Sequence, residues 1–595
     1  TLPEFLTWYR RRASHADRWE NLDDSSRQRF VDRLRAKFPR LYEDGFPAFE
    51  PHWPVPYDEV ARELPCENPL AKTKRRLLML VPWLQMGGAD KFNLDLLEQL
   101  TRAGWEVTIA ATKQGNNNWL AEFTRHTPDV FVLHHFLRGV DTPTFLRYLI
   151  RSRRPDVVLI TNSELGYLLL PYLRAVCPEP RYVDFCHMEE EYWKNGGYPR
   201  YAVASQPLLD LNIVSSEHLR QWMVRRGANP AGIEVSYTNI DPEVWRPDAT
   251  LRERTRAELG LAPDVPVILY AARICDQKQP MVFARVMQRL AERGLTFQTL
   301  VAGDGPDRAA LEAFIAEHKL EQCVRMLGPI PQGRMHALMC ASDIFFLPSR
   351  WEGIALSIYE AMACGLAVVG ADVGGQRELV TPDCGILHTR AEPDVEVAAY
   401  TESLAGLLAD PDRIRTLGQQ ARERICRHFT LDEMGRRMLG LIERTLTAPS
   451  AVGPVSASPS PFEVATRAIE YVRLSELTEQ LWRDRDFLRA EKDRLDAEAR
   501  RLGEAWEAQA GRTRELDTLK DRLWDELQSY VARVRELEEQ HAARVRELEE
   551  LNAARAREHE EHAAQIAELE QQIAALKTEL ELRSRSIVHR LLSRK

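Results

Sequence analysis

The chain has 595 residues, too many for one hydrophobic core, and its composition changes along its length. Charged residues make up 28%, and a formal net charge of -9 argues against nucleic acid as a partner, because phosphate binding needs a concentrated basic surface. The nine cysteines form no C-x-x-C pair, which predicts a reducing compartment and disfavours structural zinc.

The first 74 residues combine two helical patterns with a stretch rich in Pro and Trp. The patterns predict helices around Phe5–Trp19 and Ser25–Phe38, followed by extended chain from Phe46 to Pro65. This part has aromatic residues but no cluster of reactive side chains, so we expect residues 1–74 to form a cap that packs on the next domain. The first residue is Thr1 rather than Met, which fits either a processed chain or a piece of a longer polypeptide.

Short β-rich runs then alternate with helical segments in two consecutive series. Such alternation is typical of a parallel, doubly wound sheet. We therefore expect an α/β protein with two Rossmann-like domains in tandem, at residues 75–243 and 244–446. The predicted strands are Leu77–Val81, Glu106–Ala110, Val130–Leu133 and Asp156–Ile160 in the first series, and Val267–Tyr270, Gln298–Ala302, Val324–Leu327, Asp343–Leu347 and Ala367–Gly370 in the second.

The last part of the chain is predicted to be helical. A linker rich in Pro and Ser at 447–462 ends the globular part, and leucines recur every seven residues within 463–585. Heptads predict a coiled coil that needs a partner helix, so we expect a homo-oligomer or a partner protein. Segments starting at Ala532, Ala543 and Ala554 repeat every eleven residues, which favours little or right-handed supercoiling. The alternative is a single solvated helix stabilised by Glu–Arg pairs.

The strongest functional motif follows the predicted strand 343–347 and reads strand, loop, helix. Glu352 lies in the loop, and Glu360 lies about two turns along a helix that starts near Ala355. Gly353 permits a tight turn, and the free N–H groups of the helix start can bind an anion such as a diphosphate. The two carboxylates can therefore contact different parts of an extended ligand.

Further polar and glycine-rich segments follow other predicted strands. Arg273 and Lys278 lie beyond the carboxyl end of the strand 267–270, the usual ligand crevice of such sheets. Two cations there can hold a diphosphate and stabilise the charge of a departing nucleotide. Glycine lets the backbone approach a ligand closely. Glycine turns of this kind contain Gly87 and Gly88 after the first strand, and Gly303 and Gly305 after the strand 298–302.

These segments together resemble family 4 of the retaining glycosyltransferases (glycosyl transferases group 1), which has the GT-B fold. The run from Glu352 to Gly365 is similar to the family pattern E-G-x-x-L-x-x-x-E-A-x-A-x-G. The segment around Arg273 and Lys278 resembles G-R-x-x-x-x-K-G, but Ala272 and Gln279 stand where the family commonly has glycine.

Three more segments add to the resemblance. Leu327–Ile330 is similar to the loop that contacts the base, and Gly374–Glu378 is similar to a G-G-x-x-E turn near the phosphates. His187 ends a strand as does the family histidine that reaches the cleft near the sugar. The acidic run Glu189–Glu191 is a candidate for the acceptor pocket, with a solvated surface as the alternative.

The resemblance implies a role for each of these residues. Glu352 binds hydroxyls of the transferred sugar and Glu360 binds the ribose, whereas Arg273 and Lys278 stabilise the leaving diphosphate and His187 orients the sugar or the acceptor. It implies a nucleoside-diphosphate sugar as the donor substrate, with no cofactor and no metal. The other positions implied at the donor site are Gly87, Gly88, Gly303, Gly305, Leu327, Ile330, Gly353, Ile354, Ala355 and Leu356.

The implied activity is transfer of a sugar, with retention and without metal, to a hydroxyl of a glycan or lipid-linked acceptor in cell-surface polysaccharide biosynthesis. One alternative is another GT-B enzyme, such as a sugar-nucleotide epimerase or a phosphorylase. Another is a coiled-coil scaffold or length-control protein with an inactive GT-B domain.

The sequence also predicts where the protein is found in the cell. No apolar run approaches the roughly 20 residues that cross a bilayer, and the N-terminus lacks the order of a signal peptide, so we expect a cytoplasmic protein. The basic tail, residues 586–595, favours peripheral contact with the inner face of an anionic membrane, with an ordinary solvated end as the alternative.

Overall fold

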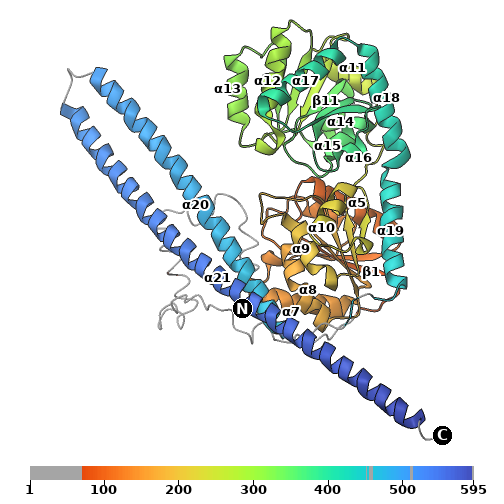
Figure 1. Ribbon diagram of the computed structural model, residues 1–595. Helices are drawn as coiled ribbons and strands as arrows, with labels where there is room; N and C mark the ends of the chain where they lie inside the picture. Colours follow the sequence, from red (N-terminus) through yellow and green to blue (C-terminus); the bar gives the residue numbers. More distant parts are fainter. Residues whose placement is uncertain (1–31, 33–69, 451, 454–459, 509–513, 593–595) are drawn as a thin grey trace. The chain divides into compact units, whose positions relative to one another are not determined.

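The computed structural model describes residue 32 and residues 70–450, 452–453, 460–508 and 514–592. The chain divides into two compact units, Thr1–Glu470 and Tyr471–Lys595. The first unit contains two sheets with helices on their faces (Figure 1). Apart from residues 32 and 70–74, the predicted cap at 1–74 lies outside the described residues, as do nearly all of its helical and extended segments.

Seven parallel strands form the first sheet, in the order β3-β2-β1-β4-β5-β6-β7. The order reverses between β1 and β4, where Rossmann-like sheets bind ligands at the carboxyl ends of their strands. All residues of β1 are buried, as expected of a strand covered on both faces. The strands are β1 Arg76–Val81, β2 Glu106–Ala111, β3 Val130–Val132, β4 Val157–Thr161, β5 Arg181–Cys186, β6 Leu211–Val214 and β7 Ile233–Val235, and the helices are α5 Gly88–Arg102, α6 Leu120–Thr124, α7 Thr142–Arg153, α8 Glu164–Val176, α9 Gly197–Ser205 and α10 Glu217–Arg225.

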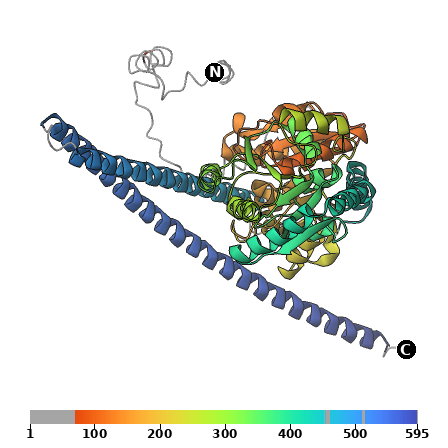
Figure 2. The ribbon, with the colours of Figure 1, turned by 90° about the horizontal axis from the view of Figure 1, so that it is seen from above.

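Six parallel strands form the second sheet, in the order β10-β9-β8-β11-β12-β13. The strand order of this sheet reverses between β8 and β11. Figure 2 shows the structure from a second direction. The strands are β8 Val267–Ala271, β9 Gln298–Ala302, β10 Val324–Gly328, β11 Ile344–Leu347, β12 Ala367–Asp372 and β13 Gly385–Thr389, and the helices are α11 Ala249–Glu258, α12 Pro280–Glu292, α13 Arg308–Glu317, α14 Gln332–Ala341, α15 Leu356–Ala363, α16 Gln376–Leu379, α17 Pro393–Leu408 and α18 Pro411–His428.

The two sheets confirm the predicted α/β class with two Rossmann-like domains in tandem. Each predicted strand matches an observed one within two residues, but β6, β7 and β13 were not predicted. In β6 the apolar run is interrupted by buried Asn212, whose amide donates a hydrogen bond to Asp184 at 2.9 Å. Strand β7 has only three residues, too few to show a pattern.

The chain crosses between the sheets twice, and the two crossings are hydrogen-bonded to each other. The N–H of Ile240 donates to the carbonyl of Phe429 at 3.0 Å, and the N–H of Leu431 donates to the carbonyl of Ile240 at 2.9 Å. The side-chain amide of Asn239 donates to the Thr430 carbonyl at 2.9 Å. This paired crossing is therefore the natural pivot for any movement of one sheet relative to the other.

After the second crossing, helix α19 (Leu431–Thr447) returns to the first sheet. Helix α19 lies next to α5 in Figure 1 and packs against it. The sequence assigned residues 244–446 to the second domain, and this boundary is wrong for α19, because its apolar face completes the core around α5 and β1. The residues that it contributes to this core are Met434, Met438, Leu441 and Ile442.

The second unit consists of the rest of α20 (Pro461–Ala508) and of α21 (Arg514–Leu592). The ring of Trp482 meets that of His541 at 5.8 Å, and Arg489 Nε lies 3.7 Å from Glu538 Oε1. These contacts make the two helices antiparallel neighbours, side by side in both views (Figures 1 and 2). The predicted helical region is confirmed, whereas a coiled coil with a second chain stays a prediction.

Helix α21 has 79 residues and is therefore about 120 Å long. Within the described residues, no helix combines the length and the apolar character needed to cross a membrane. The backbone of residues 586–592 continues α21, and contact of the basic tail with a membrane stays a prediction.

Candidate active site

Two loops of the second sheet form the centre of the candidate site. Lys278 follows β8 and Glu352 follows β11, and the Lys278 ammonium forms an ion pair with the Glu352 carboxylate. The two side chains are 17% and 7% exposed. Because β8 and β11 are neighbouring parallel strands, their carboxyl ends place the two loops together. The structure thus joins two predicted site residues that lie in separate sequence motifs.

Main-chain and side-chain hydrogen bonds hold these two loops against each other. The N–H of Arg350 donates to the carbonyl of Gln277 at 2.7 Å, and the Gln277 amide donates to the carbonyl of Trp351 at 3.1 Å. An ion pair between Arg350 and Asp276, at 3.1 Å, adds a third link. The position of Lys278 relative to Glu352 is therefore fixed by the loops themselves.

Gln279 explains how the loop tolerates the loss of a family glycine. Its φ of 49° lies in the left-handed region, which costs a non-glycine residue about 1 kcal/mol. Its buried amide donates to the carbonyl of Pro348 at 2.8 Å and to the carboxylate of Glu396 at 2.9 Å. These two buried hydrogen bonds offset the backbone cost and hold the residue next to Lys278 in place.

The glycine turn after β9 packs directly on the Arg273 loop. Gly303 has a φ of 148°, and a Cβ at this position would overlap the carbonyl oxygen of Ala272. A Cβ on Gly305 would overlap the carbonyl oxygen of Ile274 in the same way. Both positions therefore require glycine for close backbone packing, which brings the turn beside Arg273.

Leu327, near the end of β10, and Ile330, just after it, are predicted to lie near the base and are next to this turn. The N–H of Gly303 donates to the carbonyl of Gly328 at 2.8 Å, which links the two loops. Leu327 and Ile330 are partly buried against the core of the second sheet. Their contact with a nucleotide base stays a prediction.

Helix α15 begins at Leu356, close to the predicted start. Its N-cap is Ala355, whose methyl group cannot accept a hydrogen bond from the first turn. The Ile358 N–H donates to the Ala355 carbonyl at 3.0 Å, which leaves the N–H groups of Leu356 and Ser357 available to an anion, with the partial positive charge of the helix start. Gly353 and Ile354 connect this helix start to Glu352, as the sequence predicted.

The loop after β12 packs against the main chain of the Glu352 loop. Gly374 has a φ of 55°, and a Cβ there would overlap the carbonyl oxygen of Glu352. The N–H of Gly375 donates to the Gly353 carbonyl at 2.7 Å. The predicted G-G turn therefore shapes the Glu352 loop through backbone contacts.

Glu360 lies on α15, where burial controls its protonation. Burial raises the pKa of this carboxyl to about 8, although the Lys91 ammonium opposes the shift and the Asp95 carboxylate adds to it. Lys91 and Asp95 belong to α5 of the first sheet and form an ion pair with each other. Glu360 is thus placed where α15 faces α5.

Glu360→Gln is expected to be more stable than the wild type by an amount that grows with pH. The carboxyl titrates near pH 4.5 when the chain is unfolded and near pH 8 when it is folded, so the folded state holds the extra proton between these values. Wild-type stability at this site is therefore lost as pH rises from about 4.5 to about 8. Melting temperatures measured across this range test the prediction, with Glu317→Gln at an exposed position of α13 as the control. A constant difference between Glu360→Gln and the wild type would contradict it.

His187 comes from the first sheet, at the end of β5, and meets the Glu352 loop. A Cβ on Gly353 would lie 2.6 Å from the His187 carbonyl oxygen, so glycine permits this close approach. The imidazole packs on Phe92 and Phe185, with ring centroids at 5.1 and 4.7 Å. Burial lowers the pKa of His187 to about 3, which keeps the ring neutral at physiological pH.

The imidazole has an unused hydrogen-bonding atom. Nε2 of His187 is buried and has no hydrogen-bond partner among the residues that the structure describes. Ser349, in the loop before Glu352, has a buried Oγ in the same condition. Since buried polar atoms are nearly always paired, both are candidates for contact with a ligand hydroxyl. Sequence reasoning missed Ser349, because a serine after a strand is too common to indicate a site.

Gly87 and Gly88 follow β1 and lie opposite the start of α15 in the second sheet's domain. Gly87 is the N-cap of α5, and a Cβ on Gly88 would have Leu356 Cβ as its nearest neighbour, at 3.9 Å. The starts of α5 and α15 are therefore close to each other. In the first turn of α5, burial raises the pKa of Asp90 to about 7.

Glu378 does not lie free in a phosphate-proximal turn. Its carboxylate accepts hydrogen bonds from the N–H groups of Glu217 and His218, both at 2.8 Å, and from the Tyr237 hydroxyl at 3.0 Å. It therefore caps helix α10 of the first sheet and ties the two sheets together.

The acidic run after His187 is likewise engaged within the protein. Glu189 binds the His218 ring at 2.7 Å, and Glu191 accepts from the Trp222 indole at 2.7 Å. Glu191 also pairs with Arg226 at 2.8 Å. These contacts favour a structural role for Glu191, whereas the buried Oε2 of Glu189 has no hydrogen-bond partner among the described residues, so that Glu189 stays a candidate for the acceptor pocket.

Comparison with known families covers both sheets. The family Glycosyltransferase Family 4 matches residues 86–244, and the family Glycosyl transferases group 1 matches residues 252–424. The D-inositol 3-phosphate glycosyltransferase of Nocardia farcinica (strain IFM 10152) is 33% identical over 215 residues, which are 35% of this chain and 46% of that protein. The chain thus spans about half the length of this curated relative.

Solved structures of the GT-B type share the fold. A glycosyltransferase from Rickettsia africae ESF-5 has a TM-score of 0.54 at 16% identity, over 64% of this chain and 100% of the other. Anabaena Alr3699/HepE in complex with UDP has a TM-score of 0.53 at 19% identity, over 62% and 100%. The putative glycosyltransferase EpsF of Bacillus subtilis (strain 168) is 30% identical over 350 residues, 56% of this chain and 88% of that protein. With both sheets matched in this way, the chain belongs to the group 1 glycosyltransferases.

Proposed function

We propose that the chain is a retaining glycosyltransferase that moves a sugar from a nucleoside-diphosphate sugar to a hydroxyl of a glycan or lipid-linked acceptor, in cell-surface polysaccharide biosynthesis. The observation that carries the proposal is the buried Lys278–Glu352 pair beside the uncapped start of α15. The pair and the helix start offer a cation, a carboxylate and free N–H groups to one ligand. The UDP named with the HepE structure supports a donor of this kind.

Diphosphate binding in the proposal depends on Arg273, Lys278 and the N–H groups at the start of α15. Arg273 is exposed at the end of β8, and no carboxylate pairs with it among the residues that the structure describes. Its guanidinium can therefore donate to phosphate oxygens in a bidentate manner. The two cations stabilise the negative charge that develops on the leaving diphosphate, so the transfer does not require a metal ion.

Sugar and ribose contacts are assigned to the two glutamates. Glu352 accepts hydrogen bonds from hydroxyls of the transferred sugar, and Glu360, further along α15, binds the ribose. His187 is neutral and has a buried Nε2 that can bind a hydroxyl of the sugar or of the acceptor. The acceptor approaches from the first sheet, and closure of the two domains aligns the reactants and excludes water.

Retention of configuration is explained by substitution on one face of the sugar. The leaving diphosphate and the incoming hydroxyl share this face, while the anomeric carbon acquires positive charge. No covalent nucleophile is assigned to Glu352, because its carboxylate is held by Lys278 as a binding group. Product analysis with radiolabelled donor separates this activity from epimerisation or phosphorolysis, and NMR of the anomeric proton of the product reports retention or inversion.

A chain that ends after Glu470 is expected to transfer sugar with the same kcat/KM as the full chain. This cut keeps the first unit whole, including Phe462, whose ring packs on Tyr172 at 5.8 Å. The comparison separates an enzyme from a scaffold. Transfer that is absent from both chains, with intact circular dichroism, would favour the scaffold with an inactive domain. Light scattering of the same two samples tests whether the helical region makes the protein a homo-oligomer, as predicted.

A further inference from the structure

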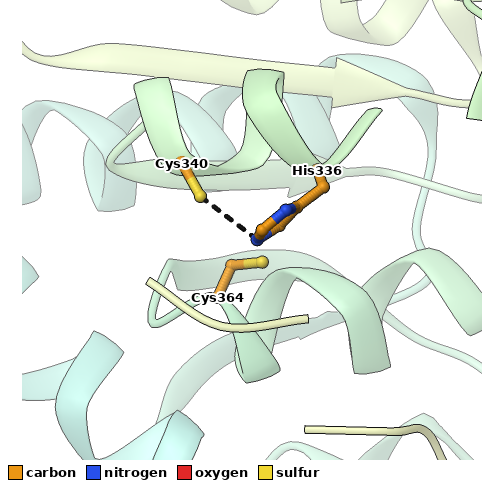
Figure 3. A group of neighbouring side chains, drawn as sticks. All are labelled: His336, Cys340 and Cys364. Carbon is orange, nitrogen blue, oxygen red and sulfur yellow. Dashed lines mark hydrogen bonds between the residues drawn. The ribbon is translucent and has the colours of Figure 1, made fainter. Parts of the chain in front are cut away.

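A cluster of three soft ligands lies in the second sheet's domain, outside the donor site. His336 and Cys340 lie on one face of α14, four residues apart, and Cys364 is the C-cap of α15 (Figure 3). One ligand atom of each residue lies within 4.8 Å of the other two. The three side chains point toward one another, as Figure 3 shows.

The spacing of these atoms fits a tetrahedral metal ion. With Zn–S bonds of about 2.3 Å and Zn–N bonds of about 2.0–2.1 Å, two ligands of one zinc ion are about 3.6 Å apart for N and S and about 3.8 Å apart for two sulfurs. The observed distance from His336 Nε2 to Cys340 Sγ is 3.4 Å. Small side-chain rotations therefore suffice to place one ion between the three residues.

Burial also suits a metal site. Cys340 and Cys364 are each 5% exposed, so the sulfurs are screened from solvent, whereas His336 is only partly buried. The ring packs edge-on against Trp245 at 5.8 Å, and Nε2 lies 2.7 Å from the Arg246 carbonyl oxygen. Packing on Trp245 thus orients the imidazole before any ion binds, which reduces the entropy lost on coordination. The contact of Nε2 with the Arg246 carbonyl has to open on binding, because zinc takes the Nε2 lone pair.

We propose that His336, Cys340 and Cys364 bind a zinc ion, with a fourth position left for water. Binding requires two thiolates and a neutral imidazole whose proton lies on Nδ1, so two thiols release two protons to solvent as two Zn–S bonds and one Zn–N bond form. Nothing is oxidised or reduced. The set of two sulfurs and one nitrogen matches the ligand preference of zinc.

The site would join α14 to the C-terminal end of α15. Cys340 Sγ lies 3.4 Å from the Arg246 carbonyl, just before α11, and Cys364 closes α15. The N–H of Cys364 donates to the Glu360 carbonyl at 3.0 Å. A bound zinc ion therefore fixes the C-terminal end of the helix whose other end faces the donor diphosphate, a structural role that the proposed transfer itself does not need.

The sequence pointed away from zinc because the cysteines form no C-x-x-C pair. His336 and Cys340 share α14, whereas Cys364 belongs to the next helix along the chain and reaches them through the packing of α14 on α15. A disulfide between Cys340 and Cys364 would involve the two sulfurs alone and would not include His336. The third ligand favours a metal ion over a redox pair.

The test is metal binding by the full chain, stripped with a chelator and kept reduced with a phosphine. Zinc is added in competition with a chromophoric chelator, and cobalt(II) is used in parallel to detect sulfur-to-metal charge transfer. We expect one ion per chain, with cobalt absorption typical of two thiolates. In Cys364→Ser and in His336→Ala the affinity should fall by at least about 100-fold, since loss of a direct ligand costs more than loss of its outer-shell partner. Cys426→Ser, at an exposed cysteine of α18, is the matched control and should bind as the wild type does.

Several results would overturn the proposal. The wild type could take up no zinc, Cys364→Ser could bind as tightly as the wild type, or the control could lose binding as well. A Cys340–Cys364 disulfide found by mass spectrometry after treatment with glutathione disulfide, in a chain that binds no zinc, would identify a redox pair instead. Circular dichroism of each variant verifies folding. His336→Ala removes one proposed ligand at a partly buried position and leaves both buried thiols in place. Because donor binding is measured separately, failure of the zinc site leaves the proposed transferase activity standing.

Discussion

Lys278→Ala is expected to reduce kcat by about 10²–10³-fold, with a much smaller change in the donor KM. The ammonium lies beside the start of α15 and next to Glu352, so it stabilises charge that appears on the diphosphate as the glycosidic bond breaks. Interactions that strengthen in the transition state raise kcat more than they lower KM. Steady-state kinetics of transfer, or of donor hydrolysis without acceptor, measure both parameters.

Two further variants separate catalysis from stability. Removal of Lys278 leaves the buried Glu352 carboxylate unpaired, which is expected to destabilise the fold by about 3 kcal/mol. Lys278→Ala combined with Glu352→Gln removes this charge, so its melting temperature should recover while kcat stays low. Lys74→Ala, at an exposed lysine before β1, is the control for loss of a positive charge. Full activity of Lys278→Ala would exclude this residue from the site.

Gly374→Ala is expected to lower kcat/KM by about 100-fold, because a misplacement of about 1 Å in a catalytic loop can cost this much. A Cβ on Gly374 overlaps the carbonyl oxygen of Glu352, so the loop that holds the carboxylate has to move. Crystal structures or donor affinities of the variant would show the displacement.

The matched control for Gly374→Ala is Gly406→Ala. Gly406 lies inside α17, and a Cβ there has no atom within 4 Å among the described residues, so the change should leave activity intact and favour the helix. Equal activity of Gly374→Ala and Gly406→Ala would show that the Glu352 loop tolerates displacement, contrary to the role assigned to it.

The fold was predictable where it is local in sequence. Runs such as Leu77–Val81 are apolar on both faces and alternate with helices, which suffices to predict parallel sheets. The return of α19 to the first sheet could not be predicted, because its apolar face fits either core equally well in sequence. The antiparallel contact of α20 with α21 was not predicted either, because a heptad pattern does not identify the helix against which its apolar side packs.

The candidate site was predictable as a set of motifs but not as a geometry. The resemblance gave Lys278 and Glu352 separately, and the order of β8 and β11 in the sheet brings them into contact. Gln279 departs from the family glycine, and only the structure shows that Pro348 and Glu396 hold it in a left-handed conformation. Contacts between segments remote in sequence depend on packing, which sequence patterns do not encode.

The cap on α10 illustrates the same limit. A glutamate after two glycines near a diphosphate site is expected to serve the ligand, yet Glu378 satisfies the free N–H groups of Glu217 and His218. Free N–H groups at a helix start attract any nearby anion, whether it belongs to a substrate or to the protein. Which anion binds follows from the relative position of the two sheets.

The most direct test of the central claim is calorimetric titration of the full chain with UDP-, GDP- and ADP-sugars. The account predicts that at least one of them binds at about one site per chain, and that Glu360→Ala weakens this binding by about 10–100-fold, as expected for loss of the hydrogen bonds between Glu360 and the ribose hydroxyls. Glu317→Ala, at an exposed position of α13, should bind as the wild type does. Binding of none of these donors, or equal affinity of Glu360→Ala and the wild type, would contradict a donor site built around Glu352 and Glu360.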